Sequence, residues 1–123
     1  MTAVMPADLC EHLVGEAMIW PNREICGFIL RGWDAEPIDN VAPKDREFYM
    51  DEQQQLEVMM QNRGKIIGVY HSHPSGQTFP SPKDIEYAPR GMRYWIIASG
   101  KVTEWVIKNG IAEAAATDSE VLA

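Results

Sequence analysis

Several residue types that define protein classes are scarce in this chain. Its 123 residues include only two cysteines, too few for a disulfide framework or a cysteine-rich zinc site. Lysine and arginine number 11 against 18 acidic residues, and the net charge of −7 is unlike the clustered basic surface that nucleic acid requires. No apolar stretch nears the roughly 20 residues of a membrane span. We therefore expect a protein that binds neither nucleic acid nor a membrane.

Repeats, low-complexity tracts and a signal peptide are also missing. The first residues lack the basic start and apolar centre of a secretory leader, so we expect a cytoplasmic protein. The length suits one domain, which we place at 1–123, and the small, acidic residues 113–123 are expected to fray. Hydrophobic residues make up 46% of the chain, as in ordinary globular proteins. None of these features indicates the oligomeric state.

Hydrophobic periodicity and turn residues predict an alternation of helices and strands. Helices are expected to begin near Pro6, Asp51 and Ser81, where a proline or a capping side chain favours the first turn. Residues 33–37 are predicted to form a turn, and Pro21 to end the first helix. Apolar runs predict strands at 25–30, 38–41, 48–50, 65–70, 94–98 and 102–108, with tight turns at 99–101 and 109–110. This order indicates an α/β fold with a mixed sheet flanked by helices.

The helix expected after Asp51 has Gln54 three residues on as a capping-box partner. Leu56, Met59 and Met60 recur at helical spacing, so we predict that they face the core and that Gly64 ends the helix.

The cysteines, Cys10 and Cys26, lie in an apolar helix face and an apolar strand. We expect buried, reduced thiols at both positions. A nucleophilic Cys26 is the alternative, but it lacks the helix start or basic neighbours that activate a thiol.

Two histidines, His71 and His73, follow the strand predicted at 65–70. Because strand side chains alternate, both leave the strand on one face and can converge on one ion at about 2.0–2.1 Å. A carboxylate from the next element, Asp84, would complete three ligands and leave a fourth position for water, as in catalytic zinc sites. The alternatives are Fe²⁺, whose oxygenases use a different ligand order, and a histidine pair that binds nothing.

The same residues form an extended motif. His71-Ser72-His73-Pro74, then Ser81 and Asp84, match the H-x-H-P-x6-S-x2-D signature of the JAMM (MPN+) metalloproteases in residue type and spacing. Glu24, just before the apolar run 25–30, is similar to the glutamate that opens a strand in this family. The resemblance extends over roughly residues 5–108.

The resemblance implies a cytidine deaminase-like, three-layer αβα fold and a Zn²⁺ cofactor. It also implies roles for individual residues. His71, His73 and Asp84 would be the metal ligands, Glu24 the general acid/base, and Ser81 a hydrogen-bond donor to the developing oxyanion. Without the resemblance, composition does not single out Glu24 from the other carboxylates. The implied reaction is hydrolysis of an amide bond.

The connection after Asp84 is short, since only Ile85–Arg93 precedes the next predicted strand. It cannot hold the large insertion with which eukaryotic JAMM enzymes grip ubiquitin chains, so the chain resembles the compact prokaryotic or phage relatives. The resemblance therefore implies a protein substrate, either the C-terminal tail of a ubiquitin-like or β-grasp sulfur-carrier protein or a phage tail component. The stretch 26–29 followed by 40–43 and Phe48 resembles both groups.

Two other functions are consistent with the sequence. MPN domains that lose their ligands act as non-catalytic binding scaffolds, although every motif residue is intact here. A metal-dependent hydrolase of a small molecule would use the same residues. A narrow, closed pocket would favour that function, and an extended groove would favour a peptidase.

Overall fold

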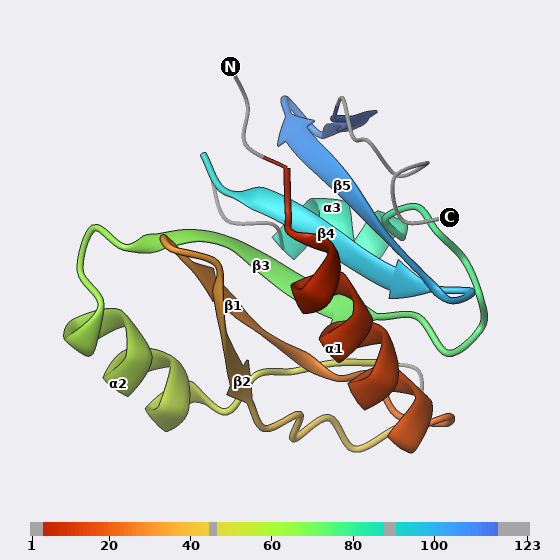
Figure 1. The fold of residues 1–123 in the computed structure, drawn as a ribbon, viewed down its shortest axis with the longest axis horizontal. Coiled ribbons are helices and arrows are strands. Elements are labelled where there is room, and N and C mark those ends of the chain that lie inside the picture. Colours follow the sequence, from red (N-terminus) through yellow and green to blue (C-terminus); the bar gives the residue numbers. More distant parts are fainter. Residues whose placement is uncertain (1–3, 45–46, 88–90, 116–123) are drawn as a thin grey trace.

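A computed structural model describes residues 4–44, 47–87 and 91–115 and shows a sheet with helices on both faces (Figure 1). Residues 1–3, 45–46, 88–90 and 116–123 are not described. In chain order, the elements are α1 (Ala7–Ile19), β1 (Cys26–Leu30), β2 (Asp34–Ile38), α2 (Glu52–Gln61), β3 (Ile66–Ser72), α3 (Pro82–Tyr87), β4 (Arg93–Ala98), β5 (Lys101–Lys108) and β6 (Ile111–Ala114).

The strands form one mixed six-stranded sheet in the order β2-β1-β3-β4-β5-β6. The pair β3–β4 is parallel, and α3 lies in the connection between these two strands. The other neighbouring pairs are antiparallel. Strands from distant parts of the chain are therefore neighbours at the centre of the sheet, where β1 lies beside β3.

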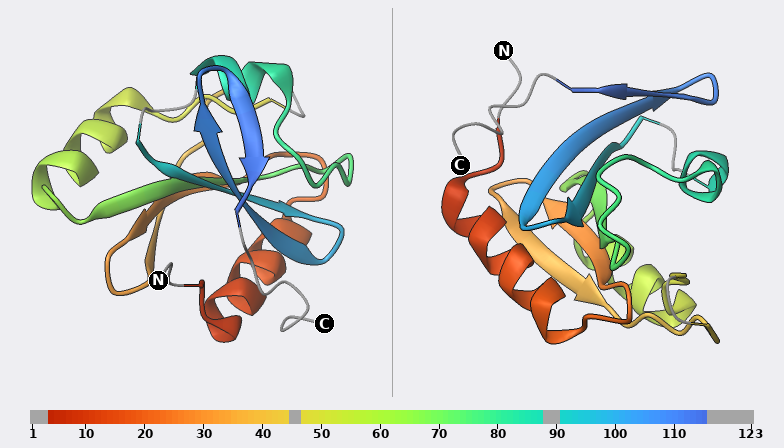
Figure 2. Two further views of the ribbon diagram at one scale, coloured as in Figure 1. Left: turned by 90° about the horizontal axis from the view of Figure 1, so that it is seen from above. Right: turned by 90° about the vertical axis from the view of Figure 1, so that its right-hand side faces the viewer.

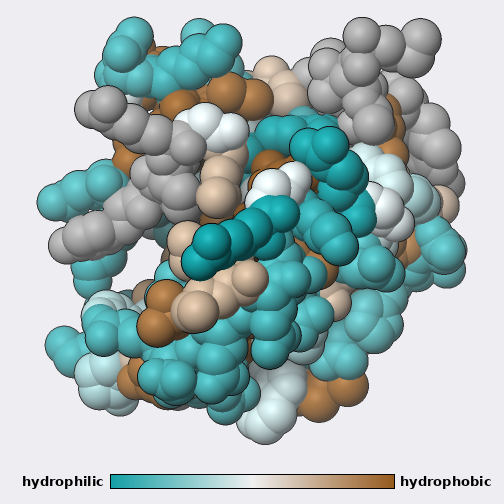
Figure 3. All heavy atoms as spheres, turned by 90° about the vertical axis from the view of Figure 1, so that its left-hand side faces the viewer, coloured by the Kyte–Doolittle hydropathy of each residue, from teal (hydrophilic) through white to brown (hydrophobic). Residues whose placement is uncertain are grey.

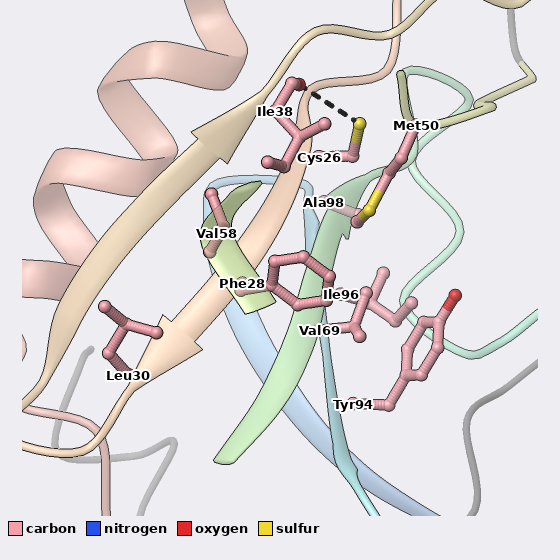
Figure 4. Packing of buried hydrophobic residues seen from close by; sticks show 10 residues of the cluster. All are labelled: Cys26, Phe28, Leu30, Ile38, Met50, Val58, Val69, Tyr94, Ile96 and Ala98. Atoms are coloured by element: carbon pink, nitrogen blue, oxygen red, sulfur yellow. Dashed lines mark hydrogen bonds between the residues drawn. The ribbon is translucent and has the colours of Figure 1, made fainter. Parts of the chain in front are cut away.

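The helices cover opposite faces, as the right-hand view of Figure 2 shows, with α1 on one side and α2 and α3 on the other. Because strand side chains alternate, odd-numbered residues of β1 such as Ile29 pack with Leu13 of α1. Even-numbered residues such as Phe28 pack on the other side with Val58 of α2 and Ile96 of β4 (Figure 4). The predicted α/β layers are thus confirmed. No helix in the described ranges is long and apolar enough to cross a membrane.

The predictions for residues 33–41 are wrong. Residues 34–38 form β2, which pairs with β1, and the turn lies at 31–33 instead. Pro37 is compatible with β2 because this is an edge strand, where a missing N–H breaks no ladder on the open side. The strands predicted at 38–41 and 48–50 reduce to a bridge between Asn40 and Met50.

Helix α2 is capped as predicted but faces the core differently. Asp51 Oδ1 accepts a hydrogen bond from the Gln54 N–H at 2.9 Å, whereas the Gln54 side chain bonds Asp39 and leaves the capping box open. The prediction for the apolar face is wrong, because Val58 is the buried residue of this helix. The three residues predicted to face the core are 45–58% exposed, and they are Leu56, Met59 and Met60. The helix lies along the edge strand β2, so the sheet covers only a narrow stripe of it.

The remaining turn and strand predictions agree with the structure. Ser99-Gly100 and Asn109-Gly110 have positive φ angles, as tight two-residue hairpin turns require, and they join β4 to β5 and β5 to β6. The second turn leads into β6, so residues 113 and 114, which we expected to fray, pair with β5. Residues 116–123 of that tail lie outside the described ranges. Both cysteines are buried and free, as predicted.

A side chain at Gly68 would have no room. A Cβ there would collide with the Arg93 carbonyl oxygen and the Trp95 ring, whereas a Cβ at Gly15 of α1 meets open space. We expect Gly68→Ala to lower the free energy of unfolding by about 1–3 kcal/mol through overpacking. Gly15→Ala should raise it by about 0.5–1 kcal/mol because alanine favours the helix. Urea unfolding measures both, and an undiminished stability in Gly68→Ala would contradict the packing described here.

Candidate active site

The pairing of β1 with β3 brings the first two site residues together. Cys26 lies opposite His71 in the antiparallel register, so Glu24, two residues before Cys26, lies beside the end of β3. The junction is fixed on both chains: Ser72 N–H donates to the Ile25 carbonyl at 3.0 Å, and Ile25 N–H donates to Ser72 Oγ at 2.9 Å. The Ser72 hydroxyl is thus engaged with the backbone, in line with the alternation that directs it away from the histidines.

The two histidine rings and the Asp84 carboxylate meet in the interior. His73 Nε2 lies 3.0 Å from Asp84 Oδ2, and His71 Nε2 lies 3.3 Å from Asp84 Oδ1. All three side chains are buried, His71 completely. The structure therefore brings together the three residues that the sequence predicted as a ligand set.

The other ring nitrogen of each histidine bonds an oxygen. His71 Nδ1 lies 2.9 Å from Glu24 Oε1, and His73 Nδ1 lies 2.8 Å from the carbonyl oxygen of Gln77. A carbonyl oxygen and a carboxylate oxygen accept hydrogen bonds, so each Nδ1 carries the hydrogen and donates it. In a neutral imidazole, Nε2 then carries the lone pair, and both lone pairs are directed towards the Asp84 oxygens.

This arrangement has a place for a cation. His71 Nε2 is buried without a hydrogen-bond partner in the described residues, since its approach to Asp84 is outside hydrogen-bonding geometry. Lone pairs facing carboxylate oxygens repel unless a metal ion or an added proton lies between them. Metal-bound histidines commonly donate their second N–H to a carboxylate or a carbonyl, as both histidines do here. Within the described residues, the metal-capable group whose ligand atoms all lie within 4.8 Å of one another is Glu24, His71 and His73, and Asp84 is not part of it.

Electrostatics at the site follow from these contacts. Burial acts to lower the pKa of His71, but its contacts with Asp84 and Glu24 outweigh burial and raise it. Burial likewise acts to raise the pKa of Asp84, whereas its contacts with His71 and His73 hold that pKa well below its usual range. Asp84 is therefore ionised at neutral pH.

The start of α3 fixes the position of Asp84. Ser81 N–H donates to Asp84 Oδ2 at 2.8 Å, and Asp84 N–H donates to Ser81 Oγ at 3.1 Å, which is a closed capping box. The predicted start of this helix is confirmed. The cap leaves the Ser81 O–H free to donate, because Ser81 Oγ uses only its acceptor capacity.

The hairpin of β4 and β5 holds the loop that carries Gln77. Thr103 Oγ1 donates to the Thr78 carbonyl at 2.6 Å, and Trp105 Nε1 donates to the same oxygen at 3.2 Å. On the other side of Gln77, Ser99 Oγ donates to the Gly76 carbonyl at 2.9 Å. The carbonyl that orients His73 is thus anchored on both sides. Gln77 could not be predicted from the sequence, since its backbone oxygen makes the contact and no side-chain pattern indicates it.

Aromatic rings enclose His71. The Phe48 ring stacks on it, with centroids 4.3 Å apart and planes 23° apart, and Tyr94 meets it edge-on at 5.1 Å. A cleft of about 750 Å³ opens beside these rings, and its lining includes Glu24, Phe48, Tyr49, Ser81 and Asp84. The five predicted site residues thus lie within one buried cluster and its cleft. In the sequence, Phe48 stands out only as part of the family resemblance, because a stack between distant residues leaves no local pattern.

A family model described as prokaryotic homologs of the JAB domain matches residues 6–108. The chain belongs to this JAB family. The match extends over nearly all of the described fold and confirms the resemblance to the JAMM metalloproteases.

Named relatives of this JAB domain come from archaea and bacteria. A protein named Desampylase from Pyrococcus furiosus is 31% identical over 73% of this chain and 72% of its own length. A second Desampylase, from Haloferax volcanii, is 31% identical over 69% of this chain and 71% of its own. A Thermus thermophilus protein named "Probable TtuB-protein conjugate cleaving protease" is 28% identical over 80% of this chain and 69% of its own length.

A solved structure shares the JAB-domain fold seen here. The solution structure of a Desulfitobacterium hafniense protein superposes with a TM-score of 0.67, at 25% identity, over 85% of this chain and 84% of the other.

Cys26 lies in β1 two residues from Glu24, but its thiol faces the core and donates to the Ile38 carbonyl at 3.4 Å. Burial raises the pKa of Cys26 to about 12 and that of Cys10 to about 11. Such thiols are protonated at neutral pH and unreactive, so a cysteine nucleophile is not part of this site.

We therefore expect neither thiol of the folded protein to react with a thiol-specific chromogenic disulfide at pH 8, and both to react in urea. The raised pKa values also mean that the unfolded state loses these protons first. Their contribution to stability is present below about pH 9 and lost as the pH rises towards 12. Rapid labelling of one thiol in the native protein would contradict the burial described here.

Proposed function

We propose that this JAB domain is a zinc-dependent isopeptidase that hydrolyses the amide bond at the C-terminal tail of a ubiquitin-like or β-grasp protein. The observation that carries the proposal is the pair of histidines whose Nδ1 atoms are bound and whose Nε2 atoms face one carboxylate. The names of the relatives, two Desampylases and a protease of TtuB-protein conjugates, support a protein conjugate as the substrate.

Two distances between the proposed ligand atoms are compatible with zinc. Ligands about 2.0–2.1 Å from a tetrahedral ion lie roughly 3.3–3.4 Å from one another. His73 Nε2 lies 3.0 Å from Asp84 Oδ2 and His71 Nε2 lies 3.3 Å from Asp84 Oδ1, and both distances are close to that spacing. In this proposal His71, His73 and Asp84 hold Zn²⁺, which would supply Lewis-acid chemistry for the amide carbonyl and the attacking water.

Two further side chains would handle protons and charge. Glu24 Oε1 accepts from His71, whereas Glu24 Oε2 makes no hydrogen bond within the described residues, and Glu24 is one of the residues that line the cleft. Oε2 is thus the atom that would take the proton of the water and deliver it to the leaving nitrogen. The free O–H of Ser81 would donate to the developing oxyanion.

The alternatives have less support. A non-catalytic scaffold does not require two buried histidines oriented towards one carboxylate. None of the three relatives described above is named for a phage role, which favours the ubiquitin-like substrate. The cleft volume falls in the range of small-molecule sites, so the relatives, and not the volume, favour a protein substrate over a small molecule.

Zinc content and cleavage test this proposal together. We expect about one zinc per chain by elemental mass spectrometry and loss of zinc in His73→Ala, which leaves two protein ligands. His12→Ala is the matched control, because His12 is the remaining histidine and is exposed on α1. Glu24→Gln should keep zinc but lower kcat by about 10²–10⁴-fold on a ubiquitin-like conjugate, because the amide cannot accept the proton.

Each role can fail separately. Full zinc in His73→Ala would rule out the ligand set, and equal zinc loss in Glu24→Gln would make Glu24 a ligand instead of the base. A wild-type protein that takes up no zinc when it is supplied would make a binding scaffold the better description.

A further inference from the structure

One half-buried side chain, Asn40, uses all of its hydrogen-bonding capacity between two parts of the site. Its Nδ2 donates to the Glu24 carbonyl at 2.9 Å and to the Glu47 carbonyl at 2.9 Å. Its Oδ1 accepts from the N–H groups of Ala42 at 2.9 Å and Tyr49 at 3.1 Å. A side-chain amide offers two donor hydrogens and two acceptor lone pairs, and all four are used here.

These four hydrogen bonds join two chain segments, one with Glu24 and one with Phe48, and each segment contacts His71. Glu24 bonds His71 Nδ1 through its side chain, and Asn40 holds the carbonyl of this same residue. Phe48 stacks on the His71 ring, and Asn40 holds its two neighbours, Glu47 and Tyr49. Glu24 and Phe48 are distant in the sequence, yet one amide sets the spacing between them.

We propose that Asn40 is a positioning residue that holds Phe48 on the His71 ring and keeps Glu24 aligned with His71. The consequence for catalysis rests on the proposed function, whereas the consequence for the His71 ring does not. Asn40 touches no reacting group itself and acts through the two residues that contact His71.

The surrounding backbone allows the side chain to be tested by itself. Arg23 donates to the carbonyls of Asn40 at 2.9 Å and Ala42 at 3.0 Å, and Val41 N–H donates to the Tyr49 carbonyl at 2.9 Å. These bonds do not involve the side-chain amide of Asn40. They therefore keep the segment near β1 when the amide is changed, and a substitution at Asn40 should loosen the site without unfolding the chain.

Asn40→Asp is the informative substitution. It keeps the acceptor oxygen for Ala42 and Tyr49 but puts an oxygen where Nδ2 faced the Glu24 and Glu47 carbonyls. Asn62→Asp is the matched control, because Asn62 is also half-buried and its Nδ2 donates to the Val58 carbonyl at 2.9 Å, at the end of α2. If Asn40→Asp does not fold, as judged by circular dichroism, Asn40→Ser replaces it, since serine adds no charge and is too short for both sides.

The first measurement is the NMR signal of the His71 ring protons, which a stacked aromatic ring shields. Phe48→Leu provides the reference without that ring. We expect Asn40→Asp to move the His71 signals in the same direction as Phe48→Leu, and Asn62→Asp to leave them at the wild-type position. Wild-type His71 signals in a folded Asn40 variant would overturn the proposal, because a purely structural role elsewhere does not displace Phe48.

The second measurement is steady-state cleavage of a ubiquitin-like conjugate. Misalignment of Glu24 should lower kcat by about 10–100-fold in Asn40→Asp, with KM little changed, and Asn62→Asp should retain wild-type kcat. An unchanged kcat would refute the catalytic consequence. Absence of cleavage by the wild-type protein would count against the proposed function alone, and the His71 signals would still decide the role of Asn40.

Discussion

The site depends on one constraint, which is that each histidine has its Nδ1 bound to an oxygen. Only then can both Nε2 lone pairs face the Asp84 carboxylate. Glu24, two residues before β1, supplies one oxygen, and the Gln77 carbonyl supplies the other from a loop that is hydrogen-bonded to the β4–β5 hairpin. The sheet, the loop and the helix cap at Ser81 therefore together orient the rings of His71 and His73 towards the Asp84 carboxylate.

Burial strengthens the electrostatic interactions within this site and raises the cost of leaving any of its groups without a partner. His71 and Asp84 lie on the same side of the sheet as Phe28 and Ile96, and both are buried, so little water screens the charge of the Asp84 carboxylate. In such surroundings a charge without a partner is costly, and removal of one member leaves the others uncompensated. Figure 3 shows by contrast that the outer surface at the α2 side of the molecule is largely hydrophilic, with hydrophobic patches between the polar side chains. The buried polar side chains of the site thus lie within a largely hydrophobic core, where their contacts with one another compensate the cost of burial.

Local signals in the sequence were sufficient for much of the fold. The cap at Asp51, the Ser81-Pro82 start and the Asn109-Gly110 turn each act within a few residues, and each prediction is confirmed. The side-by-side histidines and Asp84 were also found from spacing, although their roles remain predictions. The strand β2 was missed because Pro37 is acceptable only at an edge, and the sequence does not reveal which strand is the edge.

Other features of the structure depend on contacts between distant residues. The exposed residues of α2, such as Met60, follow from how little of the sheet this helix covers. The contact between Phe48 and His71 and the anchoring of Gln77 likewise depend on tertiary packing, which leaves no periodicity to read. The hydrophobic pattern therefore predicts the helices and strands, but it does not predict which residues from different elements pack around the site.

The pairing of β1 with β3 also has a consequence for how the chain folds. Glu24 and His71 are separated by 47 positions, whereas His73 and Asp84 are separated by 11. Contacts between distant residues carry a larger loop-closure entropy and form slowly. His73 and Asp84 can therefore come together while the chain is still partly ordered. The hydrogen bond between Glu24 and His71, which orients the His71 ring, forms only when β1 pairs with β3.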